Sequence, residues 1–428
     1  MGVIALKCAL AALAGGLAVW LPGESRIVDL ETRAYRRVFW TLAAASRCFL
    51  FFLLYVVLGQ GVPSDVSGYY VPEAERAWQG QLVYRDFPSS YGPGFPYLVG
   101  FVLHASGSAQ SLVAVAIVLE LGALAVWRRV SRDMGFGERS VRRGELLYVT
   151  SAVPLLTIAV AGQNQSWLAL GVGASLLFAL HRAPLRAALA ALGGAVLVKA
   201  LALPFWLPAG VLLARGGRRP AALFGLALGV GVALCGGLLW HFGADPALPL
   251  RREAGLSSPG NLPFLAGLLL APLGLELPRW LAWLAFASVA GWVVMRVLRR
   301  QQDARRVVHD AVAVVWLAFL VLSPKAFPGY FVIAALPIAV CVATSAASRS
   351  VYAVWQAVLA VLPSLWFRLS SPTGDVRSVG MVVIILLHLV ACACGFWLIR
   401  HALGKPADAD ASSWGTSSSP SASQPDDE

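Results

Sequence analysis

The sequence has few charged residues. Only 13% of its 428 residues are Asp, Glu, Lys or Arg, whereas 58% are apolar; average soluble domains carry about 25% charged residues. So little charge excludes an ordinary water-soluble domain. The 41 Gly, 25 Pro and 15 Trp are spread through apolar runs, which suits membrane helices, where Gly and Pro are tolerated and Trp gathers at the interfaces. The composition predicts an all-α polytopic membrane protein.

Residues that bind transition metals are also scarce. All six cysteines lie in apolar segments, and the six histidines show no paired spacing such as H-E-x-x-H. Cys392 and Cys394 are two residues apart, so a helix would turn them to nearly opposite faces. We therefore expect no disulfide, no zinc site and no other cofactor. No carboxylate cluster is apparent, which favours chemistry without a divalent metal but leaves that point open.

Acidic residues are outnumbered by basic ones, with 22 Asp and Glu against 34 Lys and Arg and a net charge of +12. The basic residues form short clusters between apolar runs, without the interleaved aromatic residues that would stack on bases. Nucleic acid is therefore not expected as a partner. Such clusters mark cytoplasmic loops under the positive-inside rule. The largest lie at 128–143, 215–219 and 296–306.

The apolar runs between these clusters predict about 10–13 transmembrane helices. The first segment, 3–22, is interpreted as a retained helix, and Arg47 in the span 40–61 is expected to reach back toward the cytoplasm. Residues 94–105 and 263–272 predict short interfacial helices. The remaining spans are expected at 109–127, 145–162, 165–181, 220–241, 279–298, 307–323, 330–346, 352–368 and 379–399.

Residues 187–214 need a different arrangement, because arginines flank both ends of the segment. Both ends are then expected in the cytoplasm, which a single span cannot achieve. Lys199, shortly before Pro204, predicts two half-helices that form a hairpin with Lys199 near its apex. A lysine within an apolar run costs about 3 kcal/mol on insertion scales, so Lys199 is expected to face a wet cavity or an anion. Snorkelling from a helix end is the alternative.

The chain is expected to form one membrane domain over 1–405. Residues 406–428 are rich in Ser, Asp and Pro and predict a disordered cytoplasmic tail. No internal repeat is visible, which counts against common transporter folds.

The longest polar interruption before the tail lies within 62–108 and is expected outside the cytoplasm. Pro72 and Gly80 predict a short helix over 72–79. Asp65 follows the span 40–61 closely, so it is held near the membrane surface. A carboxylate there could act as a general base on a hydroxyl whose co-substrate lies in the lipid. An N-cap or Asx turn is the alternative.

The order of residues in this outer loop carries a resemblance. The residues are Asp65, Tyr69, Tyr70, Gly80, Tyr84, Asp86, Phe87, Tyr91 and Pro93. They resemble the start of the GT-C fold glycosyltransferases, most closely the polyprenyl-phosphate-mannose-dependent family 87. That family has approximately D-x-x-x-Y-Y, then G-x-x-x-Y, then Y-P-P, and Gly92 here replaces the first proline.

Three later stretches extend the resemblance over about residues 40–345. The sequence GQNQS at 162–166 is similar to the family's GQ-N motif. Residues 197–208 resemble its L-x-K-P-x-x-L segment, with Ala200 in place of proline, and 323–337 resemble its late S-P-x-x-x-x-x-Y loop, with Gly329 where histidine often stands. These departures leave the sugar and the linkage open.

The resemblance implies a hexosyltransferase of the plasma membrane, with its site on the extracytoplasmic side. It would move a sugar, mannose by analogy, from a polyprenyl-phosphate donor to an acceptor hydroxyl with inversion. Asp65 would be the general base. One carboxylate suffices, because the phosphate leaves as an anion and needs no acid. The acceptor, whether glycolipid, polysaccharide or protein, stays open.

The developing phosphate charge calls for cations. Lys199, Lys325 and Arg85 are the candidates, although Lys325 could equally be solvated. The candidate contacts for sugar or acceptor are Tyr69, Tyr70, Asp86, Tyr91, Gln163, Asn164 and Tyr330. Two other functions stay open: a transporter or flippase of lipid-linked sugars, which would need more intramembrane charges than Lys199, and a polysaccharide polymerase or ligase with a diphosphate-linked donor.

Overall fold

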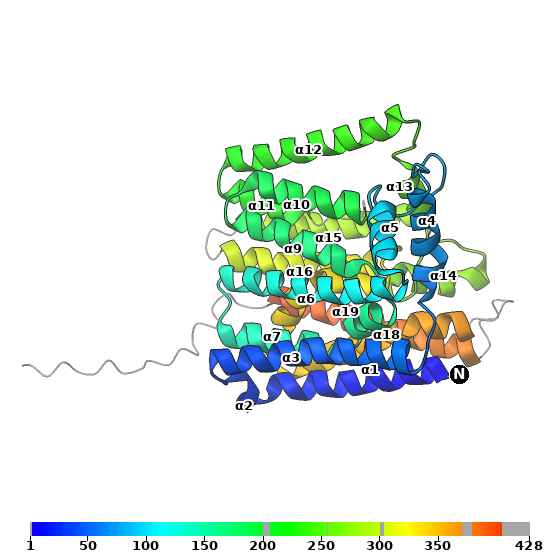
Figure 1. The fold of residues 1–428 in the computed structure, drawn as a ribbon. Coiled ribbons are helices and arrows are strands. Elements are labelled where there is room, and N and C mark those ends of the chain that lie inside the picture. The colour runs from blue at the N-terminus through cyan, green and yellow to red at the C-terminus, as the bar shows by residue number, and fades with distance from the viewer. Residues whose placement is uncertain (1, 200–205, 255, 300–303, 370–378, 405–428) are drawn as a thin grey trace, which may run out of the picture.

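The computed structural model describes residues 2–199, 206–254, 256–299, 304–369 and 379–404. Within these residues every regular element is a helix, and the long helices lie side by side in one bundle (Figure 1). The expected tail at 406–428, and Ala200 and Pro204 in the expected hairpin, fall outside the described residues.

Seven helices are long and apolar enough to cross a membrane, and the bent pair Glu138–Val149 and Ala152–Val160 would make an eighth. The chain is therefore a multi-pass membrane protein of the all-α class. The long helices are α1 (Gly2–Trp20), α3 (Thr32–Phe51, continued by a π-helix at Phe52–Val57), α6 (Gln110–Asp133), α12 (Arg218–His241), α15 (Arg279–Arg299), α18 (Ala346–Leu369) and α19 (Val379–Gly404). The bent pair is α7 (Glu138–Val149) with α8 (Ala152–Pro154) and the π-helix Leu155–Val160.

The expectation of 10–13 spans exceeds this number because several apolar helices are short. The expected spans at 165–181, 307–323 and 330–346 correspond to α9 (Gln165–Leu180), to α16 (Ala304–Leu322) and to a 3-10 helix (Pro328–Ala334) followed by α17 (Ala335–Val342). Every residue from 312 to 343 except the partly buried Phe327 is buried. A helix that is apolar on all sides belongs to the interior of a bundle, so α16 and α17 form the core that the long helices surround.

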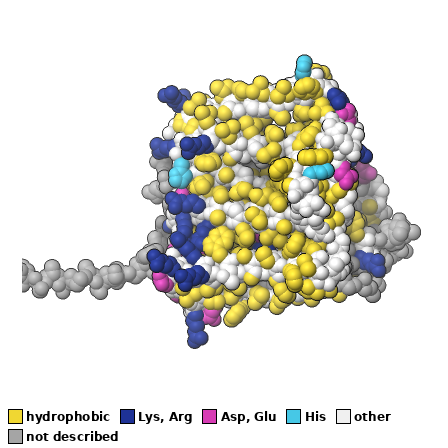
Figure 2. Space-filling model, in the orientation of Figure 1, with side chains coloured by type: hydrophobic (Ala, Val, Ile, Leu, Met, Phe, Trp, Pro, Cys, Tyr) yellow, Lys and Arg dark blue, Asp and Glu magenta, His cyan; other side chains and the backbone are white. Residues whose placement is uncertain are grey.

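The two ends of the bundle differ in charge. Figure 2 shows Lys and Arg side chains gathered at the end where α2 (Ser25–Val28) lies, with an apolar belt beyond them. We call this the basic end. The opposite end, called the loop end, holds α4 (Val71–Trp78), α5 (Phe95–Ser106), α13 (Leu248–Ala254) and α14 (Leu262–Leu270) (Figure 1). This agrees with the sequence, in which arginine clusters alternate with apolar runs and mark the loops on one side of the membrane.

The segment with arginines at both ends forms two half-helices, as expected. They are α10 (Pro184–Leu197) and α11 (Leu207–Arg215). At 1.5 Å per residue, helices of 14 and 9 residues are too short for a hydrocarbon core of about 30 Å. Lys199 lies just beyond the end of α10.

The prediction that Arg47 snorkels to the cytoplasm is wrong. Its side chain is fully buried, its Nη2 lies 2.9 Å from Glu120 Oε1, and its Nη1 donates to the carbonyl of Val149. Tyr148 donates to the same Glu120 oxygen. Arg128 and Glu145 form a second buried pair at 2.8 Å. Lys199 is therefore not the main charge inside the bundle, and acids on neighbouring helices explain why these arginines stay inside.

Glu120→Gln is expected to destabilise the protein strongly, because it leaves Arg47 buried without its counter-charge. Removing one partner of a buried ion pair typically costs about 3–5 kcal/mol. The melting temperature in detergent should fall clearly below that of the wild type. The double variant Arg47→Leu/Glu120→Leu should recover much of this loss, because it removes both charges; a double variant no more stable than Glu120→Gln would contradict this account.

Candidate functional site

Asp65 lies at the loop end, directly before the π-helix Val66–Tyr70. Its side chain caps no helix. Instead, its Oδ2 accepts a hydrogen bond of 2.9 Å from Gln163 Nε2, so the N-cap alternative is not the role that the structure shows. Burial raises the pKa of Asp65, while the charge of Lys199 and the Gln163 hydrogen bond partly offset that rise. A raised pKa makes this carboxylate a stronger base.

Tyr70 links Asp65 to the other predicted residues. Its buried hydroxyl accepts a 3.3 Å hydrogen bond from the backbone N–H of Asn164. Its ring meets Tyr91 and Phe95 edge to face, with centroid distances of 5.2 and 5.1 Å. Tyr69, the preceding residue, points outward and is half exposed. The Tyr-Tyr pair therefore supplies one residue to the interior and one to the surface.

The turn before α5 docks on the end of α10. Gly92 N–H donates to the carbonyl of Val198 at 2.9 Å, and Gly94 N–H donates to that of Val196 at 2.8 Å. A Cβ at position 92 would lie 2.3 Å from the carbonyl oxygen of Ala195. Proline would both clash and lack the N–H donor, so glycine at position 92 has a structural reason. The contact brings Tyr91 to Lys199.

Three charged side chains meet beside this turn. Lys199 Nζ lies 3.3 Å from Glu253 Oε2, and Lys325 Nζ contacts the same oxygen. The side chains of Lys199, Lys325 and Glu253 are only 11%, 3% and 9% exposed. We call them the lysine–glutamate cluster. Lys199 Nζ also lies 5.3 Å from the ring centre of Tyr91 and 5.5 Å from that of Tyr330.

The cluster depends on its acid. Burial and the neighbouring Lys199 lower the pKa of Lys325 to about 6, so an anion beside Lys325 favours its charged form. Glu253 on α13 is the acid that contacts it. No pattern in the sequence indicates this role, because Glu253 follows Arg251 and Arg252 and is far from either lysine along the chain.

Gly329 lies against Gln163, which holds Asp65. A Cβ at position 329 would stand 2.8 Å from Gln163 Oε1 and 2.9 Å from Thr157 Cγ2. Any side chain larger than that of glycine at this position would displace Gln163 or Thr157. Tyr330, the next residue, is buried, and its carbonyl accepts from Trp316 Nε1. The late loop thus contributes Lys325 and Tyr330 to the site and leaves room for Gln163.

Arg85 and Asp86 are placed differently. They pair with each other at 2.8 Å, and Asp86 also accepts from the N–H of Leu82. Arg85 makes one further hydrogen bond, to the carbonyl of Phe242. The Arg85 side chain is 47% exposed and the Asp86 side chain is 32% exposed. Among the described contacts they do not join the lysine–glutamate cluster.

Glu73, an acid in the first turn of α4, is a further polar group of this region. It accepts a 2.7 Å hydrogen bond from the fully buried Ser89 hydroxyl. Burial raises the pKa of Glu73 to about 7. It therefore ties α4 to the turn that precedes Tyr91.

A groove of about 510 Å³ opens at the loop end between α14 and α15. Phe264, Leu268 and Trp366 line it, with Glu276 and Arg279 among its polar residues, and it reaches Pro324. Pro324 directly precedes Lys325, so the groove borders the loop that carries this lysine.

No protein-family model matches the chain, and no curated protein matches it. What the site can do is therefore argued from its own residues. It combines a carboxylate of raised pKa with two largely buried lysines around one acid, at one end of a membrane bundle. Chemically, such groups can take up a proton and can bind an anion.

Proposed function

We propose that the chain is a GT-C type glycosyltransferase that moves a sugar from a polyprenyl-phosphate donor to an acceptor hydroxyl. The observation that carries the proposal is the position of Asp65, held by Gln163 and under the electrostatic influence of Lys199. The positive-inside rule assigns the basic end to the cytoplasm. The site then faces the outer side of the plasma membrane, within reach of lipid-linked substrates.

The proposed reaction uses Asp65 as the general base. Asp65 takes the proton of the acceptor hydroxyl while its oxygen attacks the anomeric carbon of the sugar, mannose by resemblance. The bond from that carbon to the phosphate oxygen breaks, and the configuration is inverted. The prenyl phosphate leaves with the electron pair as an anion, so a second carboxylic acid is not required. Glycolipid, polysaccharide and protein hydroxyls all fit this step.

Lys199 and Lys325 bind the donor phosphate in this proposal. When all four groups are ionised, the two lysines and the two acids Glu253 and Asp65 sum to zero charge. A donor phosphodiester carries one negative charge. If it takes the place of Glu253, the buried site stays neutral, which avoids the cost of an uncompensated charge. Glu253 is then a resident anion that the phosphate displaces.

The other predicted contacts fall around this centre. Three tyrosines are close to these charged groups: Tyr70 is buried near Asp65, and the buried Tyr330 and the partly buried Tyr91 lie beside Lys199. Gln163 and Asn164 present amides at the same place. We propose them as walls of the sugar pocket, with the exposed Tyr69 toward the acceptor. The groove at Phe264 and Trp366 would hold the prenyl chain, whose phosphate then reaches Lys325.

A donor-cleavage assay tests this function. Purified protein is incubated with prenyl-phosphate-mannose, with and without a membrane-lipid extract that supplies acceptors. Release of prenyl phosphate that depends on the extract supports the transferase. A donor that stays intact, but crosses the bilayer of proteoliposomes, would instead support a transporter of lipid-linked sugar. Release from a diphosphate-linked donor alone would support a polymerase or ligase.

The pH profile gives a sharper test of Asp65. The base must be deprotonated to act, so kcat/KM is expected to fall as the pH drops through the raised pKa of Asp65. Gln163→Leu removes a hydrogen bond that lowers this pKa, and it should move the acidic limb to higher pH. A limb that stays in place in Gln163→Leu, with turnover intact, would exclude Asp65 as the group that titrates.

A further inference from the structure

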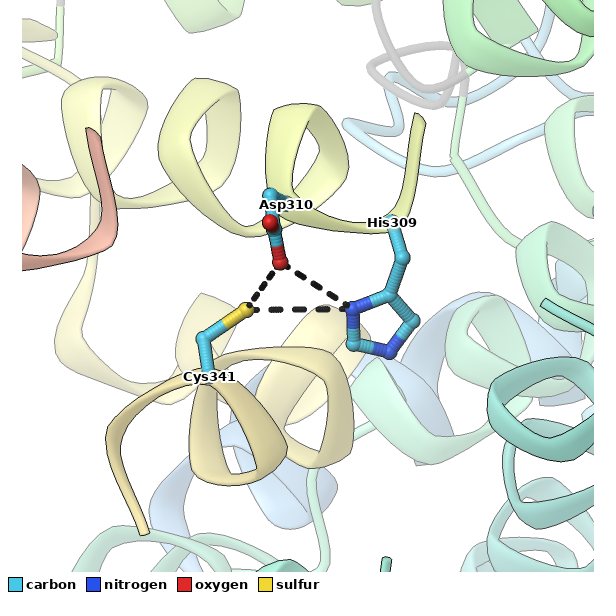
Figure 3. A group of neighbouring side chains, drawn as sticks. All are labelled: His309, Asp310 and Cys341. Carbon is cyan, nitrogen blue, oxygen red and sulfur yellow. Dashed lines mark hydrogen bonds and ion pairs between the residues drawn. The ribbon is translucent and has the colours of Figure 1, made fainter. Parts of the chain in front are cut away.

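A separate group of side chains lies away from the lysine–glutamate cluster. His309 and Asp310 on α16 and Cys341 on α17 point toward one another (Figure 3). Cys341 Sγ lies 3.1 Å from Asp310 Oδ1 and 3.7 Å from His309 Nδ1, and Nδ1 lies 3.9 Å from Oδ1. His309 and Cys341 are buried. The sequence showed no metal-binding spacing, because the cysteine is more than 30 residues from the other two.

We propose that these three side chains bind a zinc ion. Zn²⁺ bonds of about 2.0–2.3 Å at tetrahedral angles place donor atoms about 3.3–3.6 Å apart. The three separations in the structure, 3.1, 3.7 and 3.9 Å, bracket this range, so small side-chain shifts bring all three donors onto one ion. Thiolate and imidazole together favour zinc over magnesium or calcium, which prefer oxygen ligands.

A further contact orients the histidine. Its Nε2 lies 3.1 Å from the buried hydroxyl of Ser131 on α6, and its ring packs against Phe136 at a centroid distance of 4.3 Å. In the tautomer whose Nε2–H donates to Ser131, the lone pair of Nδ1 faces Cys341 and Asp310. Metal-binding histidines are typically oriented by such a hydrogen bond at the other ring nitrogen.

Charge balance also fits a divalent ion. Without metal, the Cys341 thiol donates a hydrogen bond to the Asp310 carboxylate. The ion would replace the thiol proton, which leaves to solvent, and the thiolate and carboxylate together neutralise the two charges of Zn²⁺. Asp310 is 34% exposed, so the ion has a route in and a water molecule has room as the fourth ligand.

The site would join α16 to α17 near the start of the first and the end of the second. These two elements flank the late loop that carries Lys325 and Tyr330. A zinc ion would therefore hold α16 and α17 together at the helix ends that lie farthest from this loop. Its role is structural, and it does not depend on the proposed sugar transfer.

Metal binding is tested on the full-length protein in detergent. After equilibration with Zn²⁺ and removal of excess ion, we expect about one zinc per chain. Substitution by Co²⁺ should give the visible bands of a tetrahedral ion and a near-ultraviolet band from thiolate bonding. Zn²⁺ should also raise the melting temperature. Cys341→Ser should lose the thiolate band, and Asp310→Asn should bind zinc at least tenfold more weakly.

Cys392→Ser serves as the matched control, because Cys392 is also a buried cysteine but lies on α19. It should keep the zinc content and the Co²⁺ spectrum. Size-exclusion profiles and helix content confirm that each variant is folded. A wild-type protein that retains no zinc, or a thiolate band that persists in Cys341→Ser, overturns the proposal. Because every readout concerns the metal, its failure is separate from any failure of the transferase assignment.

Discussion

Asp65→Asn is expected to reduce sugar transfer by about 10²–10⁴-fold, the range that a general base contributes. Asparagine has the same shape as aspartate, but it cannot take the acceptor proton. Its amide can still pair with Gln163 after a rotation of either group, so folding should be preserved. The measurement is release of prenyl phosphate from prenyl-phosphate-mannose under saturating donor.

Glu75→Gln is the control for this variant, because Glu75 is an exposed acid on α4 at the same end of the bundle. It should keep the activity of the wild type. Asp65→Asn should bind the donor as well as the wild type does, because Lys199 and Lys325 are unchanged. Full activity in Asp65→Asn would refute the general-base role, and loss of donor binding along with activity would point to a structural role instead.

Much of the fold follows from the sequence because the membrane restricts the choices. Apolar runs and arginine clusters predict where helices begin and end, and the arginines on both sides of 187–214 indicate the half-helices that α10 and α11 form. The sequence predicts 10–13 spans, whereas the described residues hold seven or eight helices of full spanning length and several shorter apolar ones. Hydropathy alone does not distinguish a helix that faces lipid from one that lies inside the bundle, such as α17.

Charges inside the bundle were harder to predict. The sequence alone predicts that Arg47 reaches toward the cytoplasm. Its partner Glu120 lies 73 residues away, so nothing near Arg47 in the chain indicates a buried ion pair. Glu253 was missed for the same reason: nothing in its own segment indicates Lys199 or Lys325. Pairing between distant segments depends on helix packing, which single-sequence patterns do not contain. The loop residues Asp65, Tyr70 and Tyr91 could be singled out because they stand close together in the chain.

Lys199→Met is expected to lower kcat/KM for the lipid-phosphate donor by about 10²–10³-fold, comparable to losing a group that stabilises developing negative charge. Methionine keeps the apolar stem but removes the ammonium, so packing against Tyr91 is largely retained. The measurement is donor saturation kinetics together with direct binding of prenyl phosphate. Arg85→Met removes a cation from the same end of the bundle, one that pairs with Asp86, and it should change donor kinetics by less than about threefold.

Glu253→Gln should act in the opposite direction on binding. If the donor phosphate displaces Glu253, removing its charge removes a competitor, and prenyl phosphate should bind severalfold more tightly than to the wild type. A purely structural role for Glu253 predicts the reverse, because the buried lysines would repel each other and the pocket would loosen. Weaker binding in Glu253→Gln would therefore refute the exchange, and an equal effect of Arg85→Met and Lys199→Met would refute the lysine pair as the phosphate site.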